Sequence, residues 1–210
     1  MKNLAVFASG SGTNLENLAL KIKEKQLINC KIELVVSDQA EAFALKRAKK
    51  YYLKTAVIER PNFETKQEFE KTIMRELEKH KIDYIILAGF MRILSPEFIR
   101  AFPLRIINIH PALLPEFPGA HAIRDAWDAK AKTTGVSVHF VDEGIDTGPL
   151  IFQKKVGISH FGTFEDLEKR IHEVEYKLYP KAVQLLIDGQ LSVVEGKVCS
   201  DGKPLTTLVQ

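Results

Sequence analysis

Two polar stretches of the sequence carry side chains that could together do acyl-transfer chemistry. Asn108 and His110 stand two residues apart at the end of an apolar run, and Asp146 lies in a later polar loop. An amide can donate to a developing oxyanion, an imidazole can move a proton at neutral pH, and a carboxylate can orient that imidazole. This set of residues indicates an enzyme of acyl-transfer type.

The segments around these residues favour a functional site over a structural one. Residues 111–118 hold three prolines, which predicts a rigid loop directly after a buried strand. Asn108 and His110 share one face of that strand. The acidic, glycine-rich loop 141–149 reads as a hairpin turn without calcium-loop spacing, so a metal is disfavoured. Four other histidines have no metal-ligand spacing, and most of them are interpreted as structural: His121, His139, His160 and His172.

A glycine-containing turn, Ser9-Gly10-Ser11-Gly12-Thr13-Asn14, lies where the first expected strand meets the first expected helix. Glycine lets the backbone approach an anion, and a helix N-terminus favours negative charge, so phosphate is the expected ligand. The alternative is a tight turn whose serine, threonine and asparagine only cap the helix. Leu15 replaces the third glycine of a dinucleotide fingerprint, and the Gly-Lys-Ser/Thr of a P-loop is missing.

The apolar segment 88–94 follows the expected strand 84–88, on the side where open α/β sheets bind ligands. It could line a slot for a flat ring, although such a segment taken alone is more often core. Arg92 could reach a carboxylate or remain in solvent.

Charge and composition exclude several classes of protein. Thirty Lys and Arg against 27 Asp and Glu leave a net charge of +3, with the signs interleaved, which does not indicate nucleic-acid binding. Cys30 and Cys199 form neither a disulfide framework nor a zinc motif. Because no apolar run reaches the length of a membrane span, we expect a soluble, cytoplasmic protein without a membrane partner.

Short apolar runs alternate with amphipathic stretches, which predicts one α/β domain over residues 1–210 with a doubly wound, mostly parallel sheet. A short hairpin is expected at the C-terminus, and Pro180 suggests a kink or break in the last helix. The expected strands are 4–8, 31–36, 84–88, 105–109 and 135–141, and the expected helices are 14–26, 39–51, 64–80, one opening at Ser95-Pro96-Glu97, 119–130 and 163–189.

Several motifs resemble the folate-dependent phosphoribosylglycinamide formyltransferases of purine biosynthesis over nearly the whole chain. They are the glycine turn at 9–14, Ala-Gly-Phe-Met-Arg-Ile-Leu-Ser-Pro at 88–96, Asn-Ile-His-Pro-Ala-Leu-Leu-Pro at 108–115, Gly-Val-Ser-Val-His-Phe-Val at 135–141 and Asp-Thr-Gly-Pro at 146–149. The resemblance implies a Rossmann-like formyltransferase fold and formyl transfer from 10-formyltetrahydrofolate to the amine of glycinamide ribonucleotide, in de novo synthesis of IMP. It requires no metal, and it leaves the oligomeric state open between monomer and homodimer.

The resemblance also assigns roles to residues. Asn108, His110 and Asp146 would be catalytic, and Asp146 would favour the imidazolium form of His110. Residues 1–100 would form a phosphate-binding half and residues 85–190 a folate and catalytic half, and Leu114-Pro115 would be cis. Lys66 lies where some members of the family have an arginine near the folate. The implied substrate contacts are Gly12, Thr13, Asn14 and Glu175, and the implied folate contacts are Lys66, Met91, Arg92, Ile93, Leu94, Asn108 and Asp142.

Other functions remain open at this point. Methionyl-tRNA formyltransferases and formyltetrahydrofolate hydrolases share the Asn-x-His-Pro and Asp-x-Gly-Pro pair but add a further domain, for which 210 residues would leave no room. A nucleotide-binding oxidoreductase would use the glycine turn, with Asp38 as its ribose-binding acid. A non-catalytic phosphosugar-binding module would need the 9–14 turn but not the Asn/His/Asp trio.

Overall fold

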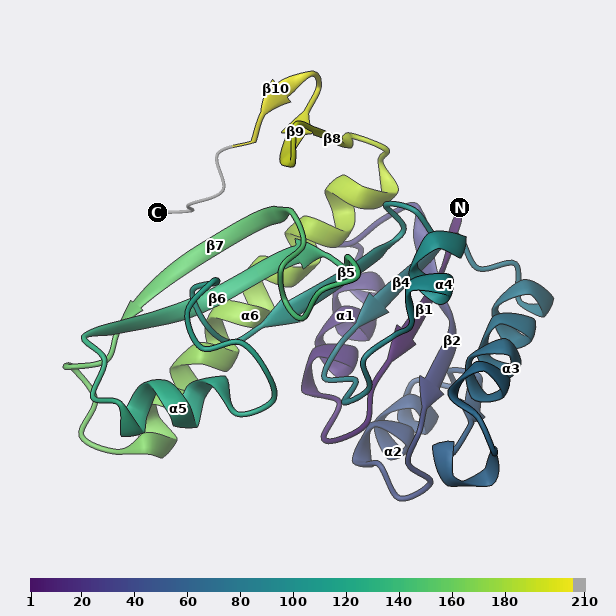
Figure 1. Ribbon diagram of the computed structural model, residues 1–210, viewed down its shortest axis with the longest axis horizontal. Helices are drawn as coiled ribbons and strands as arrows, with labels where there is room; N and C mark the ends of the chain where they lie inside the picture. Colours follow the sequence, from purple (N-terminus) through teal and green to yellow (C-terminus); the bar gives the residue numbers. More distant parts are fainter. Residues whose placement is uncertain (206–210) are drawn as a thin grey trace. The chain divides into compact units, whose positions relative to one another are not determined.

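The computed structural model describes residues 1–205 and shows two compact units, Met1–Ile107 and a second that begins at Asn108 (Figure 1). The fold is the predicted one, a mostly parallel sheet with flanking helices and an antiparallel element at the C-terminus. The prediction that residues 1–210 form a single domain stays a prediction.

In the first unit, four parallel strands lie in the order β3-β2-β1-β4. Phe7 at the end of β1 is in register with Val36 of β2 and Leu87 of β4, so the loops after these strands leave from one edge. Residues 4–8 are fully buried, as expected for a strand covered on both faces. The elements are β1 (Lys2–Phe7), α1 (Thr13–Lys23), β2 (Cys30–Ser37), α2 (Phe43–Lys50), β3 (Thr55–Val57), η1 (Arg60–Asn62), α3 (Lys66–Lys79), β4 (Tyr84–Leu87) and α4 (Pro96–Ala101).

The start of α4 is fixed by side-chain hydrogen bonds. The Ser95 hydroxyl accepts from the backbone N–H of Phe98, and Pro96 takes the first helical position, as the sequence predicts. Ser95 also donates to the buried carboxylate of Glu70, through its hydroxyl and through its backbone N–H at 2.8 Å. The backbone that precedes α4 is therefore anchored to α3.

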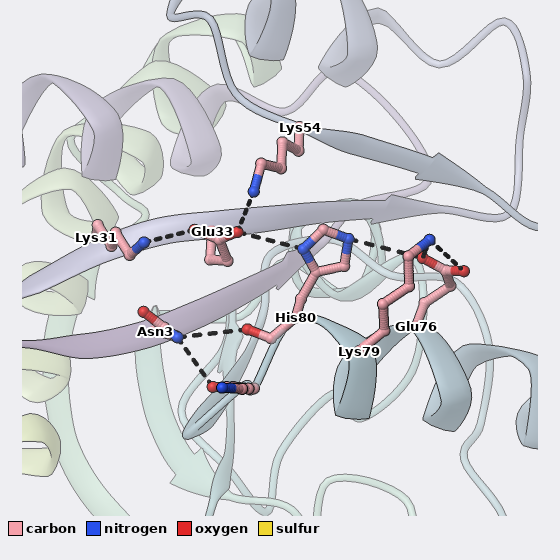
Figure 2. Close-up of polar contacts among 8 residues, drawn as sticks. Asn3, Lys31, Glu33, Lys54, Glu76, Lys79 and His80 are labelled. Atoms are coloured by element: carbon pink, nitrogen blue, oxygen red, sulfur yellow. Dashed lines mark hydrogen bonds and ion pairs between the residues drawn. The ribbon is translucent and has the colours of Figure 1, made fainter.

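A cluster of charged residues anchors the other end of α3 to β2 (Figure 2). Glu33 on β2 accepts from Lys31, Lys54 and, at 3.2 Å, from His80, which follows α3. Hydrogen bonds from the two lysines lower the pKa of Glu33 to about 2. The Asn3 side chain donates to the carbonyls of His80 and Lys81, at 3.3 and 3.0 Å. These contacts fix the turn between α3 and β4.

The second unit begins within β5, which is the neighbour of β6, and β6 pairs antiparallel with β7. The long helix α6 packs along β6 and β7, as Figure 1 shows. The elements are β5 (Ile106–His110), α5 (Ala122–Asp128), β6 (Thr133–Phe140), β7 (Leu150–Gly157), α6 (Phe164–Ile187) and an antiparallel sheet of β8 (Leu191–Val194), β9 (Lys197–Ser200) and β10 (Lys203–Pro204).

Pro180, β3 and Pro115 are the places where the fold tests single expectations from the sequence. The prediction of a break at Pro180 is wrong, because α6 continues through it. Burial of Leu178, Tyr179, Ala182 and Val183 on both sides of the proline outweighs the roughly 3 kcal/mol that an interior proline costs. The short strand β3 was not expected, since three residues are too few to show a pattern. The Leu114-Pro115 bond is cis, as predicted.

The predicted C-terminal hairpin is confirmed over its described part, and residues 206–210 lie outside the described residues. None of the helices in the described part of the chain is both long and apolar enough to cross a membrane.

We predict that the capping box at the start of α3 stabilises the first unit. Thr65 accepts from the N–H of Glu68, whose side chain accepts from the N–H of Thr65. Thr65→Ala should lower the free energy of unfolding by about 1 kcal/mol. Thr72→Ala is the control, because Thr72 lies inside the same helix and its hydroxyl only donates to the Glu68 carbonyl. The control should be neutral or slightly stabilising, since alanine favours helix. Urea denaturation followed by circular dichroism would measure both variants. An equal loss of unfolding free energy in Thr65→Ala and Thr72→Ala would contradict the capping role.

Candidate active site

The glycine turn of the first unit is held by α2. Gly10 accepts from the N–H of Ala44, and the Arg47 side chain donates to the Ser11 carbonyl at 2.9 Å. Gly12 has φ +72°, and a Cβ there would lie 2.6 Å from Ala44 Cα, so only glycine fits without strain. The N-cap residue of α1 is Gly12, which has no side chain to cap the helix, and this disfavours the interpretation of the turn as a simple cap. Thr13 and Asn14 occupy the first helical positions.

The segment 88–94 is anchored to this turn. The Met91 N–H donates to the Ser9 hydroxyl at 2.8 Å, and Arg92 donates to Asp38 at 2.6 Å. Arg92 therefore reaches a carboxylate, which the sequence left open. The Asp38 carboxylate is buried and already bound by protein donors, which disfavours its use as the ribose-binding acid of an oxidoreductase.

The predicted folate residues of the first unit differ in exposure. Met91 and Ile93 are 60% exposed, whereas Leu94 is buried. Lys66 lies 3.8 Å from the carboxylate of Glu70, which also holds Ser95. The segment therefore carries two exposed apolar side chains, and Lys66 lies beside the carboxylate that anchors its far end.

The second unit brings Asn108, His110 and Asp146 together. Asp146 Oδ1 lies 3.5 Å from the Asn108 amide nitrogen, and Asp146 Oδ2 lies 3.5 Å from His110 Nδ1. His110 is buried, and its Nε2 donates to the Phe117 carbonyl at 2.8 Å. Because Nε2–H is held in this way, Nδ1 is the nitrogen that can exchange a proton beside Asp146.

His139 belongs to the same cluster, although the sequence pattern assigned it no role and most of the four histidines in its group were interpreted as structural. Its Nδ1 lies 2.8 Å from the Phe140 carbonyl and must donate to it, while Nε2 lies 3.3 Å from the Asn108 amide and 3.6 Å from Asp146. A neutral His139 accepts from Asn108, and a protonated one donates toward Asp146. The sequence signal for His139 was its place in the Gly-Val-Ser-Val-His-Phe-Val motif at 135–141, on the strand that precedes the acidic loop.

The Asp146 carboxylate is the electrostatic centre of this cluster. Burial favours its neutral form and is the largest single effect on it. Contacts with His139, the Gly119 N–H at 2.9 Å and the charges of His110 and His139 together outweigh burial and lower the pKa of Asp146 from 3.8 to about 2. Asp146 is therefore ionised throughout the neutral range, as a group that stabilises an imidazolium must be.

The loop that carries His110 is tied to the neighbouring strands. The Ser137 hydroxyl donates to the Ala112 carbonyl and accepts from the Leu114 N–H, at 2.6 and 3.1 Å. Gln153 on β7 donates to the Leu114 carbonyl at 2.9 Å. The sequence predicted a rigid loop from its prolines, and the structure adds these polar ties.

Two further predicted binding residues have local partners. Glu175 on α6 is buried and accepts from His172 at 2.8 Å. That hydrogen bond raises the pKa of His172 above 6.5, although burial opposes the shift. Asp142 accepts from the Thr147 hydroxyl and the Gly144 N–H, at 2.7 and 3.2 Å, which shapes the acidic loop. Within residues 1–205, no group of three or more His, Cys, Asp or Glu side chains is arranged to hold a metal ion.

The arrangement in the second unit can donate to an oxyanion and keep a carboxylate ionised beside an imidazole. These are the requirements of acyl transfer. The profile of the formyl transferase family matches residues 2–183, and the chain belongs to this family.

The similar proteins carry a more specific name. Phosphoribosylglycinamide formyltransferase of Bacillus subtilis (strain 168) is 41% identical over 187 residues, which are 89% of this chain and 95% of that protein. The solved structure of the phosphoribosylglycinamide formyltransferase of Coxiella burnetii in complex with CHES has a TM-score of 0.92 and 35% identity, and the match covers 100% of this chain and 99% of that one. Glycinamide ribonucleotide transformylase 1 of Symbiobacterium toebii gives a TM-score of 0.91 at 36% identity, covering 95% and 94% of the two chains.

We predict that the Asp146 carboxyl titrates with a midpoint near 2, against the usual 3.8. Because the folded-state pKa lies below the unfolded value, ionised Asp146 stabilises the protein above pH 4, and this contribution is lost as the pH falls toward 2. Carboxyl carbon NMR shifts, assigned with Asp146→Asn, would measure the midpoint. A midpoint at or above 3.8 would show that the imidazoles and the Gly119 N–H do not stabilise the ionised form of Asp146.

Proposed function

We propose that this chain is a phosphoribosylglycinamide formyltransferase, which transfers the formyl group of 10-formyltetrahydrofolate to the amine of glycinamide ribonucleotide. The products are formylglycinamide ribonucleotide and tetrahydrofolate, on the route to IMP. The observation that carries the proposal is the meeting of Asn108, His110 and Asp146 within 3.5 Å contacts in a chain of the formyl transferase family.

The reaction begins with attack of the glycinamide amine on the formyl carbon, and negative charge develops on the formyl oxygen. In our proposal the Asn108 amide donates to that oxygen, and protonated His110 places a positive charge beside it. His110 and His139 are buried and Asn108 and Asp146 are half-buried, so these interactions are less screened there than in water.

Collapse of the tetrahedral intermediate breaks the bond between the formyl carbon and N10 of the folate. The amine loses one proton and N10 gains one, so no oxidant or net proton source is needed. Asp146 keeps the imidazolium form of His110 favourable and passes the proton through water.

The binding roles complete the proposal. Gly12, Thr13 and Asn14 contact the ribonucleotide phosphate, and Glu175 holds the glycinamide end. Lys66, residues 91–94, Asn108 and Asp142 contact the folate, which is a co-substrate, and the chemistry requires no metal. A cytoplasmic location, a monomeric or homodimeric state and the lack of nucleic-acid or membrane partners remain predictions of the sequence.

We predict that purified protein changes the folate absorbance only when glycinamide ribonucleotide and 10-formyltetrahydrofolate are both present. Release of tetrahydrofolate with water alone would favour a hydrolase. Tight, saturable NADH binding measured by fluorescence, without formyl transfer, would instead support the oxidoreductase alternative.

We predict that His110 and Asp146 act as one unit. Asp146→Asn should keep the fold and much of the substrate binding but lower kcat by about 100-fold to 10,000-fold, the range of general acid–base contributions. The double variant with His110→Ala should be little worse than the worse single variant.

The control for this cycle is Glu116→Gln, an exposed change in the same proline-rich loop that should leave kcat about unchanged. Circular dichroism would verify folding of each variant. Losses that multiply fully in the double variant would show that Asp146 does not act through His110. Such a result would overturn the mechanism assigned to the pair.

A further inference from the structure

A buried carboxylate at the end of β2 collects donors from three segments of the first unit. Asp38 is 2% exposed. Its Oδ1 accepts from the Ser9 hydroxyl at 2.5 Å, and its Oδ2 accepts from Arg92 at 2.6 Å and from Gln39 at 3.3 Å. Burial is the largest effect on this group and opposes ionisation, but the donors from Ser9, Arg92 and Gln39 outweigh it and lower the pKa below 3.8. Asp38 is therefore a buried anion with its charge satisfied by protein donors.

Ser9 extends this contact into the backbone of the segment that follows β4. Its hydroxyl donates to Asp38 and accepts from the Met91 N–H at 2.8 Å, while its own N–H donates to the Gly89 carbonyl at 2.9 Å. The segment is thus held at Gly89 and Met91 through Ser9, and at Arg92 through Asp38 directly.

Two further contacts hold the segment that follows β4, one at Ser95 and one at Phe90. Ser95 is bound to Glu70, and the Phe90 ring packs edge-on against Phe7 with centroids 5.1 Å apart. Between these fixed points, Met91 and Ile93 keep 60% of their surface exposed. The ties thus fix the backbone of a segment whose two most exposed side chains, Met91 and Ile93, are apolar.

We propose that Asp38 is a positioning residue for folate binding: through Ser9 and Arg92 it holds residues 89–92 in the shape that presents Met91 and Ile93 to the flat ring of the folate. This inference rests on the proposed function, in which residues 91–94 contact the folate. Asp38 itself does not touch substrate, because its oxygens are taken by protein donors.

Asp38→Asn tests the charge with little change of shape. An amide in this place keeps one oxygen as an acceptor, but its NH₂ cannot accept from Arg92. Glu33→Gln is the matched control, because Glu33 lies on β2, the strand that Asp38 directly follows, has a lowered pKa and accepts from Lys31, Lys54 and His80. Asp38→Glu keeps the negative charge, so it should change Met91 amide exchange and the folate KM less than Asp38→Asn does.

The first measurement needs no substrate. Hydrogen exchange of the Met91 amide, followed by NMR, should become at least about 10-fold faster in Asp38→Asn and Ser9→Ala, as expected for loss of a charge-assisted network. Glu33→Gln should leave it unchanged. Should Asp38→Asn fail to fold by circular dichroism, Ser9→Ala, which removes only a hydroxyl, carries the test. Unchanged Met91 exchange in the folded variants would overturn the proposal.

The second measurement separates binding from chemistry. In Asp38→Asn the KM for 10-formyltetrahydrofolate should rise about 10-fold to 100-fold, while kcat and the KM for glycinamide ribonucleotide change much less. Suppose that the wild type is active. An unchanged KM for 10-formyltetrahydrofolate in Asp38→Asn, or an equal rise of this KM in Glu33→Gln, would then overturn the positioning role alone. A wild type that neither binds nor turns over folate would overturn the proposed function and the ligand assigned to this segment, even if the exchange result held.

Discussion

The parallel pairing of β1 with β2 and β4 is the constraint on which the first unit depends. Because Phe7, Val36 and Leu87 are in register, the three loops that follow these strands start side by side. Near this edge the strands are buried and almost entirely apolar, so polar chemistry falls to the loops that follow them. Ser9, Asp38 and Arg92, far apart in the sequence, therefore meet at this edge.

Carboxylates with little exposure to solvent then set the positions of the groups around them. Four side chains with low exposure, Asp38, Glu70, Asp146 and Glu175, each accept from a donor of the same unit. An ionised carboxylate out of water is unfavourable unless it is paired and hydrogen-bonded, so the donors cannot turn away without a large cost. Each carboxylate thus orients its neighbours more firmly than exposed pairs such as Arg100 with Glu97.

The sequence predicted those parts of the fold and site that local pattern specifies. Alternating apolar runs predicted the parallel sheet, and the spacing of Asn108 and His110 predicted a shared face. Side-chain partners across the sheet have no local signal. Arg92 could have stayed in solvent, and His139 looked structural, because their partners Asp38 and Asp146 are set by tertiary packing. At Pro180, burial overrode a strong local preference.

The conformation of the acidic loop shows that the backbone, more than side-chain length, places Asp146. Asp146 has φ +54°, a left-handed conformation that aspartate tolerates better than most residues. A Cβ at Gly148 would overlap the Phe140 carbonyl, so the chain passes closely over the end of β6. Such a path costs free energy and persists only because Asp142 and the β6–β7 pairing hold both ends of the loop. The carboxylate thereby reaches His110 and His139 from a fixed backbone position, which is the preorganisation that stabilisation of an imidazolium requires.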